Sequence, residues 1–369
     1  MSYGMTLRMN NNLKPALILG SGFHRHVFGA ENNLNHYHSI YQPLWDWHAL
    51  IDATAERMQV ACSSRAQEPV MRWETLIIRA QKDGFRDLKG EWIPPSEHAA
   101  HEVEDKAKVF VADILKELST NYPESRRSQI PLSRDWGCVI SLNFDHAWLG
   151  GLKPSNMEVT VPGGVSNANK VSDTERYRTE ASVPPEVIGQ SGNSNPRVWF
   201  PNGTILKPKS IRMGLHDYGG STTSIKETFG QLKAWERQTP PAGTARTKTN
   251  FEHVVGALRN ASEKEQTIAP SLDKPDIPDM PLTWVAEFMY RPLWFAGVGL
   301  SSQESGLWWL LAQRARNTAR VQGLPEDHTR ILVHKKDRSK FWASRPFGVK
   351  AVFCDNWDDG WDHILKSLN

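Results

Sequence analysis

The sequence Pro15-Ala16-Leu17-Ile18-Leu19-Gly20-Ser21-Gly22 places a short, continuous apolar run directly before two glycines. Such a run is typical of a strand that is buried on both faces of a parallel sheet. Glycines after a strand let the backbone approach a pyrophosphate closely, and a helix that follows them presents the positive end of its dipole. An ordinary tight turn explains the same residues, because Arg25 stands where the third glycine of a full GxGxxG pattern would be.

Further strands and helices alternate along the rest of the chain. The other predicted strands are residues 137–142, 292–299, 329–334 and 349–354. Apolar residues at helical spacing predict helices over residues 45–60, 70–82, 100–118 and 304–320, and a last helix that carries Trp357, Trp361 and Leu365. This alternation predicts an α/β fold: a Rossmann-like, doubly wound and mainly parallel sheet with helical insertions.

The expected domain organisation is one domain with two insertions. Residues 1–13 read as a flexible tail, and residues 14–369 as a nucleotide-binding domain. A helical insertion is expected over about residues 40–125. A loop or lid is expected over about residues 153–196, because that stretch is rich in Asn, Ser, Gly and Pro and shows only weak periodicity.

Composition argues against several classes of partner. A formal net charge of +3, with Lys and Arg scattered along 369 residues, gives no indication of a nucleic-acid partner. The three cysteines, Cys62, Cys138 and Cys354, form no CxxC pair, so we expect neither a disulfide framework nor a zinc ribbon nor another metal site. No stretch approaches the roughly 20 apolar residues of a membrane span. We therefore expect a cytoplasmic protein with no membrane partner.

Polar residues follow the second predicted strand as Asn143-Phe144-Asp145. The carboxyl ends of parallel strands form the edge where open α/β sheets bind ligands. An amide and a carboxylate two residues apart on an extended segment point to the same side, so Asn143 and Asp145 are expected to share one ligand. The alternative is that Asp145 caps the helix that follows.

The third segment of interest is Gly297-Val298-Gly299-Leu300-Ser301-Ser302-Gln303-Glu304, which closes a predicted strand. Its hydroxyl groups, on Ser301 and Ser302, are suited to bind ribose or phosphate oxygens. An ordinary helix start explains the same residues, since Ser302 precedes Glu304 and a helical pattern.

In this order, the three segments resemble the sirtuin-like family. The resemblance extends over roughly residues 14–365 through scattered motifs, and it includes Asn202-Gly203, which matches the His-Gly segment of the family. It implies NAD as substrate or ligand. The implied NAD contacts are Gly20, Ser21, Gly22, Phe23, His24, Gly297, Gly299, Ser301 and Glu304.

Two departures from the family pattern indicate the branch. Without CxxC pairs the chain resembles the zinc-less bacterial sirtuin-like effectors, which hydrolyse NAD during antiphage defence, within large oligomers or beside a second protein. The second departure is Asn202, which stands where the family has its catalytic histidine. An amide has no basic nitrogen, so it cannot replace a histidine as general base.

Two functions remain open from the sequence. In the first, the chain releases nicotinamide from NAD, with Asn143 positioning the ribose or the attacking water, Asp145 holding the carboxamide, and a histidine such as His24 or His216 replacing the missing base. In the second, the chain is a catalytically impaired subunit that binds NAD or ADP-ribose for sensing or assembly. A Rossmann-like enzyme for another nucleotide is a further alternative.

Overall fold

A single eight-stranded sheet forms the centre of the protein. The computed structural model describes residues 13–27, 40–95, 100–120, 122, 130–132, 136–145, 147–149, 158–160, 180–182, 197–238, 283–300, 304–320, 329–337 and 347–368. The parallel strands are β1 (Ala16–Leu19), β4 (Cys138–Ser141), β7 (Arg197–Trp199), β8 (Leu293–Ala296), β9 (Thr329–His334) and β10 (Val349–Cys354). Two antiparallel strands, β6 (Glu180–Ser182) and β5 (Glu158–Thr160), extend the sheet beyond β7.

The strand order identifies where the chain changes direction across the sheet. The order is β10-β9-β8-β1-β4-β7-β6-β5, so β1 lies between β4 and β8. Across the sheet from β7 to β10, the six parallel strands are the third, second, first, fourth, fifth and sixth in the order of the chain. This is the strand order of a doubly wound Rossmann-like sheet. This confirms the predicted α/β class with a mainly parallel sheet. In such sheets the loops after the first and fourth parallel strands, here β1 and β8, diverge, and ligands bind in the crevice between them.

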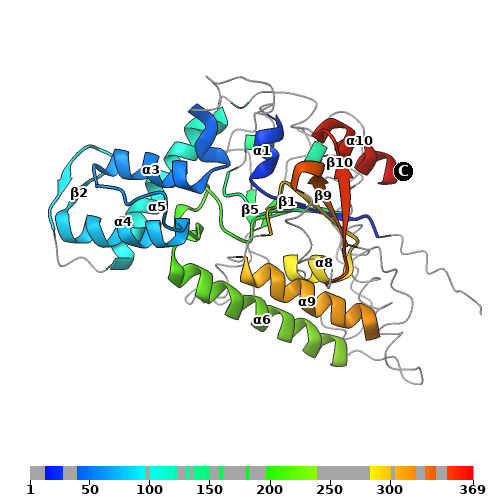
Figure 1. Cartoon of the computed structure of the whole chain (residues 1–369). Helices are drawn as coiled ribbons and strands as arrows, with labels where there is room; N and C mark the ends of the chain where they lie inside the picture. The colour runs from blue at the N-terminus through cyan, green and yellow to red at the C-terminus, as the bar shows by residue number, and fades with distance from the viewer. Residues whose placement is uncertain are drawn as a thin grey trace, which may run out of the picture.

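Helices cover both faces of the sheet (Figure 1). Leu17 and Leu19 of β1 belong to one core, together with residues of α1 (Gly22–Val27) and α10 (Trp357–Leu368). Ala16 and Ile18 belong to the other core, with residues of α6 (Leu215–Gln238), α8 (Trp284–Tyr290) and α9 (Ser305–Arg320). Because successive residues of β1 point into opposite cores, every residue of this strand is buried, and this explains the continuous apolar run.

A helical lobe lies at one side of the sheet and consists of α3 (Trp47–Met58), α4 (Pro69–Asp83) and α5 (Ala100–Thr120) (Figure 1). The carboxylate of Asp46 caps α3 by accepting a hydrogen bond from the His48 N–H at 2.9 Å. A short hairpin of β2 (Phe85–Arg86) and β3 (Trp92–Ile93) lies between α4 and α5 in the chain. The three helices confirm those predicted within residues 40–125.

The lobe is held against the start of α6 by charged side chains, of which Lys108 is buried. Lys108 of α5, whose side chain is 6% exposed, lies 3.1 Å from Glu104 and 2.8 Å from Asp217. Asp217 also accepts a hydrogen bond from the Met213 N–H, and Glu74 of α4 accepts one from the Leu215 N–H at 2.7 Å. These bonds fix the first turn of α6 against the lobe.

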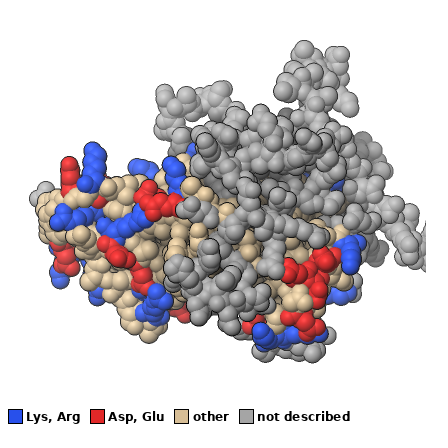
Figure 2. All heavy atoms as spheres, turned by 90° about the horizontal axis from the view of Figure 1, so that it is seen from above, with Lys and Arg blue, Asp and Glu red and all other residues tan. Residues whose placement is uncertain are grey.

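Charges of both signs alternate on the described surface of the lobe that Figure 2 shows from above. Arg57 lies between Asp113 and Glu117, and Arg65 pairs with Asp52. Over the described residues of this face there is accordingly no patch of one sign. No described helix is both long and apolar enough to cross a lipid bilayer.

Several elements differ from the sequence-based expectation. Strands β5 and β6 fall within residues 153–196, so the expected loop or lid contributes an edge to the sheet. Strand β7 and helices α6 and α8 were not expected as elements. Leu13, assigned to the flexible tail, is 6% exposed and packs in the core with α8, while residues 1–12 lie outside the described residues.

Candidate functional site

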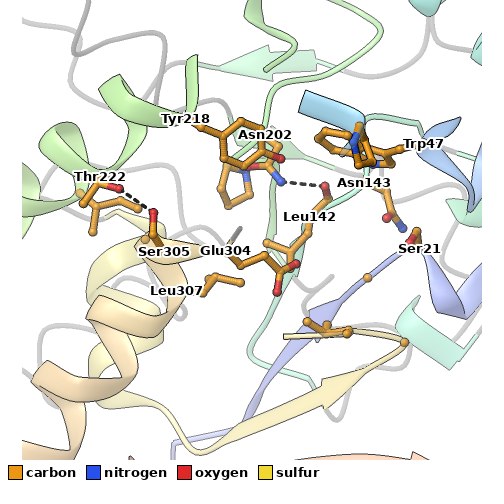
Figure 3. A pocket seen from close by; sticks show the side chains of 18 of the residues that line it. Ser21, Trp47, Leu142, Asn143, Asn202, Tyr218, Thr222, Glu304, Ser305 and Leu307 are labelled. Atoms are coloured by element: carbon orange, nitrogen blue, oxygen red, sulfur yellow. Dashed lines mark hydrogen bonds between the residues drawn. The ribbon is translucent and has the colours of Figure 1, made fainter. Parts of the chain in front are cut away.

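A pocket of about 380 Å³ opens at the carboxyl ends of β1, β4, β7 and β8 (Figure 3). Its position is the crevice between the loops after β1 and β8. The segments that follow the strands contribute Gly20, Ser21, Asn143, Asn202, Gly297 and Gly299. The surrounding helices and their first residues contribute Trp47, His48, Tyr218, Thr222, Trp284 and Glu304. The three segments singled out in the sequence therefore meet at one site.

The floor of the pocket is a close contact between two backbones. The N–H of Gly22 donates to the carbonyl oxygen of Gly297 at 2.9 Å, and Gly297 has a φ of +65°. A Cβ on Gly20 would lie 2.4 Å from the same oxygen. These glycines are therefore needed for the packing of the two loops, whatever ligand the pocket takes.

The turn after β1 offers fewer amides to a phosphate than the sequence pattern suggested. The amides of Gly20, Gly22, Phe23 and His24 donate to carbonyl oxygens of Ala296, Gly297, Gly20 and Ser21, respectively. Gly20 and Ser21 line the pocket, whereas Gly22 packs beneath it. An anion at this site would therefore depend on Ser21 and on groups from other elements.

Substitution by alanine distinguishes a glycine that is needed for packing from one that is not. Gly20→Ala is expected to lower the free energy of unfolding by about 1–3 kcal/mol, because its Cβ would overlap the Gly297 backbone. Gly299→Ala is the matched control: a Cβ there meets nothing within 4 Å, so a change within about 0.5 kcal/mol is expected. Urea unfolding measures both, and equal losses would contradict the role given to the Gly20 contact.

A buried hydrogen-bond network centred on His24 lies behind Asn143. The Asn143 Nδ2 lies 3.2 Å from Nε2 of His24, which is 0% exposed. That same Nε2 lies 3.1 Å from Oδ2 of Asp145, and the other ring nitrogen of His24 lies 2.9 Å from the hydroxyl of Tyr122. Asp145 also accepts a hydrogen bond from the Ala147 N–H, at the start of a 3-10 turn over Ala147–Leu149.

The network fixes the protons of His24. Burial raises the pKa of Tyr122 well above its ordinary range, and the Asp145 charge adds to this, so the phenol keeps its proton and can donate to His24 Nδ1. Nε2–H then donates to the Asp145 carboxylate. Both ring nitrogens are engaged, and neither His24 nor Asp145 lines the pocket.

These positions correct three expected ligand contacts. His24 and Asp145 lie behind the pocket wall, and Asp145 takes the capping role that the sequence left open. Phe23 is 1% exposed and packs edge-on against Trp361, with ring centroids 5.7 Å apart. Of the polar residues predicted on this side, Asn143 and Ser21 remain in the pocket (Figure 3).

Asn202 lines the pocket from the loop after β7. Its side-chain Nδ2 donates to the carbonyl oxygen of Leu142 at 3.0 Å. The backbone carbonyl oxygen of Asn202 accepts a hydrogen bond from the Arg212 N–H. The next residue, Gly203, has a φ of +88°, and a Cβ there would lie 2.0 Å from the carbonyl oxygen of Ser210. The segment is therefore fixed on both sides of Asn202.

The opposite wall joins α6 to α9. Thr222 and Ser305 are hydrogen-bonded to each other at 3.1 Å, and Glu304 lies at the start of α9 (Figure 3). Burial raises the pKa of Tyr218, and Glu304 adds to this shift, so the phenol stays protonated and is a hydrogen-bond donor. Ser301 lies outside the described residues, as does the side chain of His216 in α6.

Sequence reasoning missed the contribution of the helical lobe. Trp47 and His48, at the start of α3, line the pocket, and the Trp47 ring meets Tyr218 of α6 with centroids 5.9 Å apart. The lobe residues were expected only as a helical insertion, with no part in the site. The signal that could have found these residues is the polar and aromatic pair at the start of an otherwise apolar helix.

The pocket combines aromatic walls with amide, hydroxyl, imidazole and carboxylate groups. This set suits a ligand that has flat rings and several oxygens. Among the described residues, no three His, Cys, Asp or Glu side chains gather into a metal-binding group. No family model matches the chain, and a search of curated proteins finds no match either.

Proposed function

We propose that the pocket binds NAD, or a related ADP-ribose-bearing nucleotide, and that the chain hydrolyses NAD to nicotinamide and ADP-ribose. The observation that carries the proposal is the convergence of Ser21, Asn143 and Gly299 in one pocket at the point where the strand order reverses. Open α/β sheets bind nucleotides at that point. A volume of about 380 Å³ falls in the range of small-molecule sites, roughly 300–1,000 Å³.

Each wall has a part in this proposal. Ser21 and the backbone near Gly299 lie where a diphosphate would approach the sheet. Asn143 would orient the ribose next to the nicotinamide, since its side chain lines the pocket close to Ser21 (Figure 3). The Trp47 and Tyr218 rings would cover a base or the nicotinamide.

The reaction breaks the bond between the nicotinamide nitrogen and ribose C1′. The electron pair goes to the pyridinium nitrogen, which becomes neutral, and C1′ takes on positive charge in an oxocarbenium-like state. A water oxygen then bonds to C1′ and releases its proton to solvent. The Glu304 carboxylate would supply negative charge that stabilises the developing cation. The orientation of the bound NAD and water would supply much of the rest of the rate enhancement.

A second function has its own support. Asn202 has no basic nitrogen, and both ring nitrogens of His24 are hydrogen-bonded away from the pocket. A chain with this site would bind the nucleotide and turn it over slowly, as a sensing or assembly subunit does. In either form, the resemblance to zinc-less sirtuin-like effectors extends the proposal to a role in bacterial antiphage defence. The chain would act there as a homo-oligomer or with a second protein.

Calorimetry and a nicotinamide-release assay test the two functions together. Binding of NAD and ADP-ribose with release of nicotinamide supports the hydrolase, and binding without release supports the subunit. Absence of binding to either nucleotide contradicts both.

Asn143→Ala is expected to weaken NAD binding and to slow any nicotinamide release, each by roughly tenfold or more, because a buried hydrogen bond to the ligand is lost. Asn356→Ala is the matched control. Asn356 also follows a parallel strand, β10, but caps α10 away from the pocket. Equal affinities of Asn143→Ala and the wild-type protein would remove Asn143 from the site.

A further inference from the structure

His48 joins the pocket to a buried arginine in the helical lobe. The residue lies in the first turn of α3 and lines the pocket. Arg72 of α4, 1% exposed, has its Nη1 3.0 Å from His48 Nδ1 and donates to the His48 carbonyl oxygen at 3.2 Å. The imidazole is therefore held from the lobe side by a charged group.

Arg72 is fixed in turn by its other contacts. Its Nε and Nη2 donate to the carbonyl oxygen of Ser63 at 3.2 and 3.0 Å, and Nη2 also bonds the Asp52 carboxylate. Nη2 lies 2.9 Å from the Sγ of Cys62 as well. Because the Asp52 carboxylate is bound at Nη2, the positive end of this ion pair faces His48 through Nη1.

The chemistry of the guanidinium sets the tautomer of His48. A guanidinium has five N–H donors and no acceptor, so the imidazole atom that meets it must offer a lone pair. Nδ1 of His48 is therefore unprotonated, and the single ring proton lies on Nε2. In this tautomer His48 offers the pocket an N–H donor at Nε2 and no base.

We propose that His48 is a ligand-binding residue whose Nε2–H donates to a diphosphate oxygen of the nucleotide, and that Arg72 is the positioning residue that fixes this tautomer. The inference rests on the proposed nucleotide-binding function. A phosphate oxygen suits this donor, because a hydrogen bond from an N–H group to an ionised oxygen is shorter and stronger than one between neutral groups. His48 would supply a donor that the hydrogen-bonded amides of the turn after β1 do not.

Binding measurements with graded ligands test the contact. His48→Leu is expected to weaken ADP-ribose and ADP binding by roughly ten- to a hundredfold, the loss of one hydrogen bond to a charged group, and to leave adenosine binding unchanged. His48→Gln, whose amide nitrogen can reach the position of Nε2, is expected to stay within about fivefold of wild type. His101→Leu, an exposed histidine of α5 outside the pocket, is the matched control and should bind as wild type does.

Nitrogen NMR of histidine-labelled protein tests the tautomer without a ligand. The wild-type spectrum is expected to show an unprotonated Nδ1 and a protonated Nε2 for His48, and Arg72→Lys is expected to lose this preference while its fold is checked by circular dichroism. A protonated Nδ1 in the wild-type protein overturns the proposal, as does equal ADP-ribose binding by His48→Leu and wild type. If the wild-type protein binds none of the nucleotides, the proposed function fails and this inference fails with it.

Discussion

Asn202→His is expected to increase nicotinamide release from NAD by about 10²- to 10⁴-fold, the usual contribution of a general base. The reason lies in the hydrogen bond that Asn202 already makes. Its Nδ2 donates to the carbonyl oxygen of Leu142 at 3.0 Å, and Nδ1 of a histidine at this position falls close to the same point. A proton held there on Nδ1 leaves Nε2 unprotonated and available to accept a proton from water or a ribose hydroxyl.

The pH profile identifies the new base. An imidazole with an ordinary pKa of about 6.5 is protonated at low pH, so the gain should be absent below about pH 5.5 and complete above about pH 7.5. Asn202→Gln is the control, since it keeps an amide and adds no base. A His variant with wild-type rates across this range, in protein that still binds NAD, would contradict the role assigned to position 202.

Breaking the buried ion pair of α8 is expected to cost about 3–5 kcal/mol of stability. Glu287 and Arg291 are 0% and 1% exposed and are hydrogen-bonded to each other one helical turn apart. Arg291 also donates to the carbonyl oxygen of Lys14, next to the start of β1, at 2.9 Å. Either Glu287→Leu or Arg291→Met leaves a charge in the protein interior without its principal partner.

The double variant distinguishes the loss of the ion pair from the loss of side-chain packing. Glu287→Leu combined with Arg291→Met removes both charges, so it should recover most of the loss seen in each single variant. Urea unfolding of the four proteins gives the coupling energy. Single variants that each lose less than about 1 kcal/mol would contradict this assignment. Nucleotide affinity of the folded variants should be unchanged, because neither residue of the pair lines the pocket.

The sheet could be predicted where its strands are buried on both faces. Strands β1, β4 and β8 are buried along their whole length, and their apolar residues make this visible in sequence. Strand β9 is buried at all but one residue, whereas β10 is buried only at its two ends. Strand β7 has three residues after a polar stretch and gives no such pattern. Helix α6 contains Gly219-Gly220-Ser221-Thr222-Thr223, residues of low helix propensity. Its first turn depends on tertiary contacts, among them the bond between Lys108 and Asp217.

The site could be predicted mainly where its residues come soon after strands. Ser21, Asn143 and Gly299 are in that position, and all three line the pocket. The role of Asp145 could not be decided, because it depends on His24, 121 residues away in the chain. His48 could not be identified either, since its orientation comes from Arg72 on a different helix.

The central position of β1 has a consequence for protein synthesis. The ribosome makes this strand long before β8, which is one of its two partners in the sheet. Ribosomes add roughly 5–20 residues per second, so β1 waits for tens of seconds with one edge unpaired. During that interval the floor shared by Gly20 and Gly297 does not exist, so the nascent chain has no completed pocket.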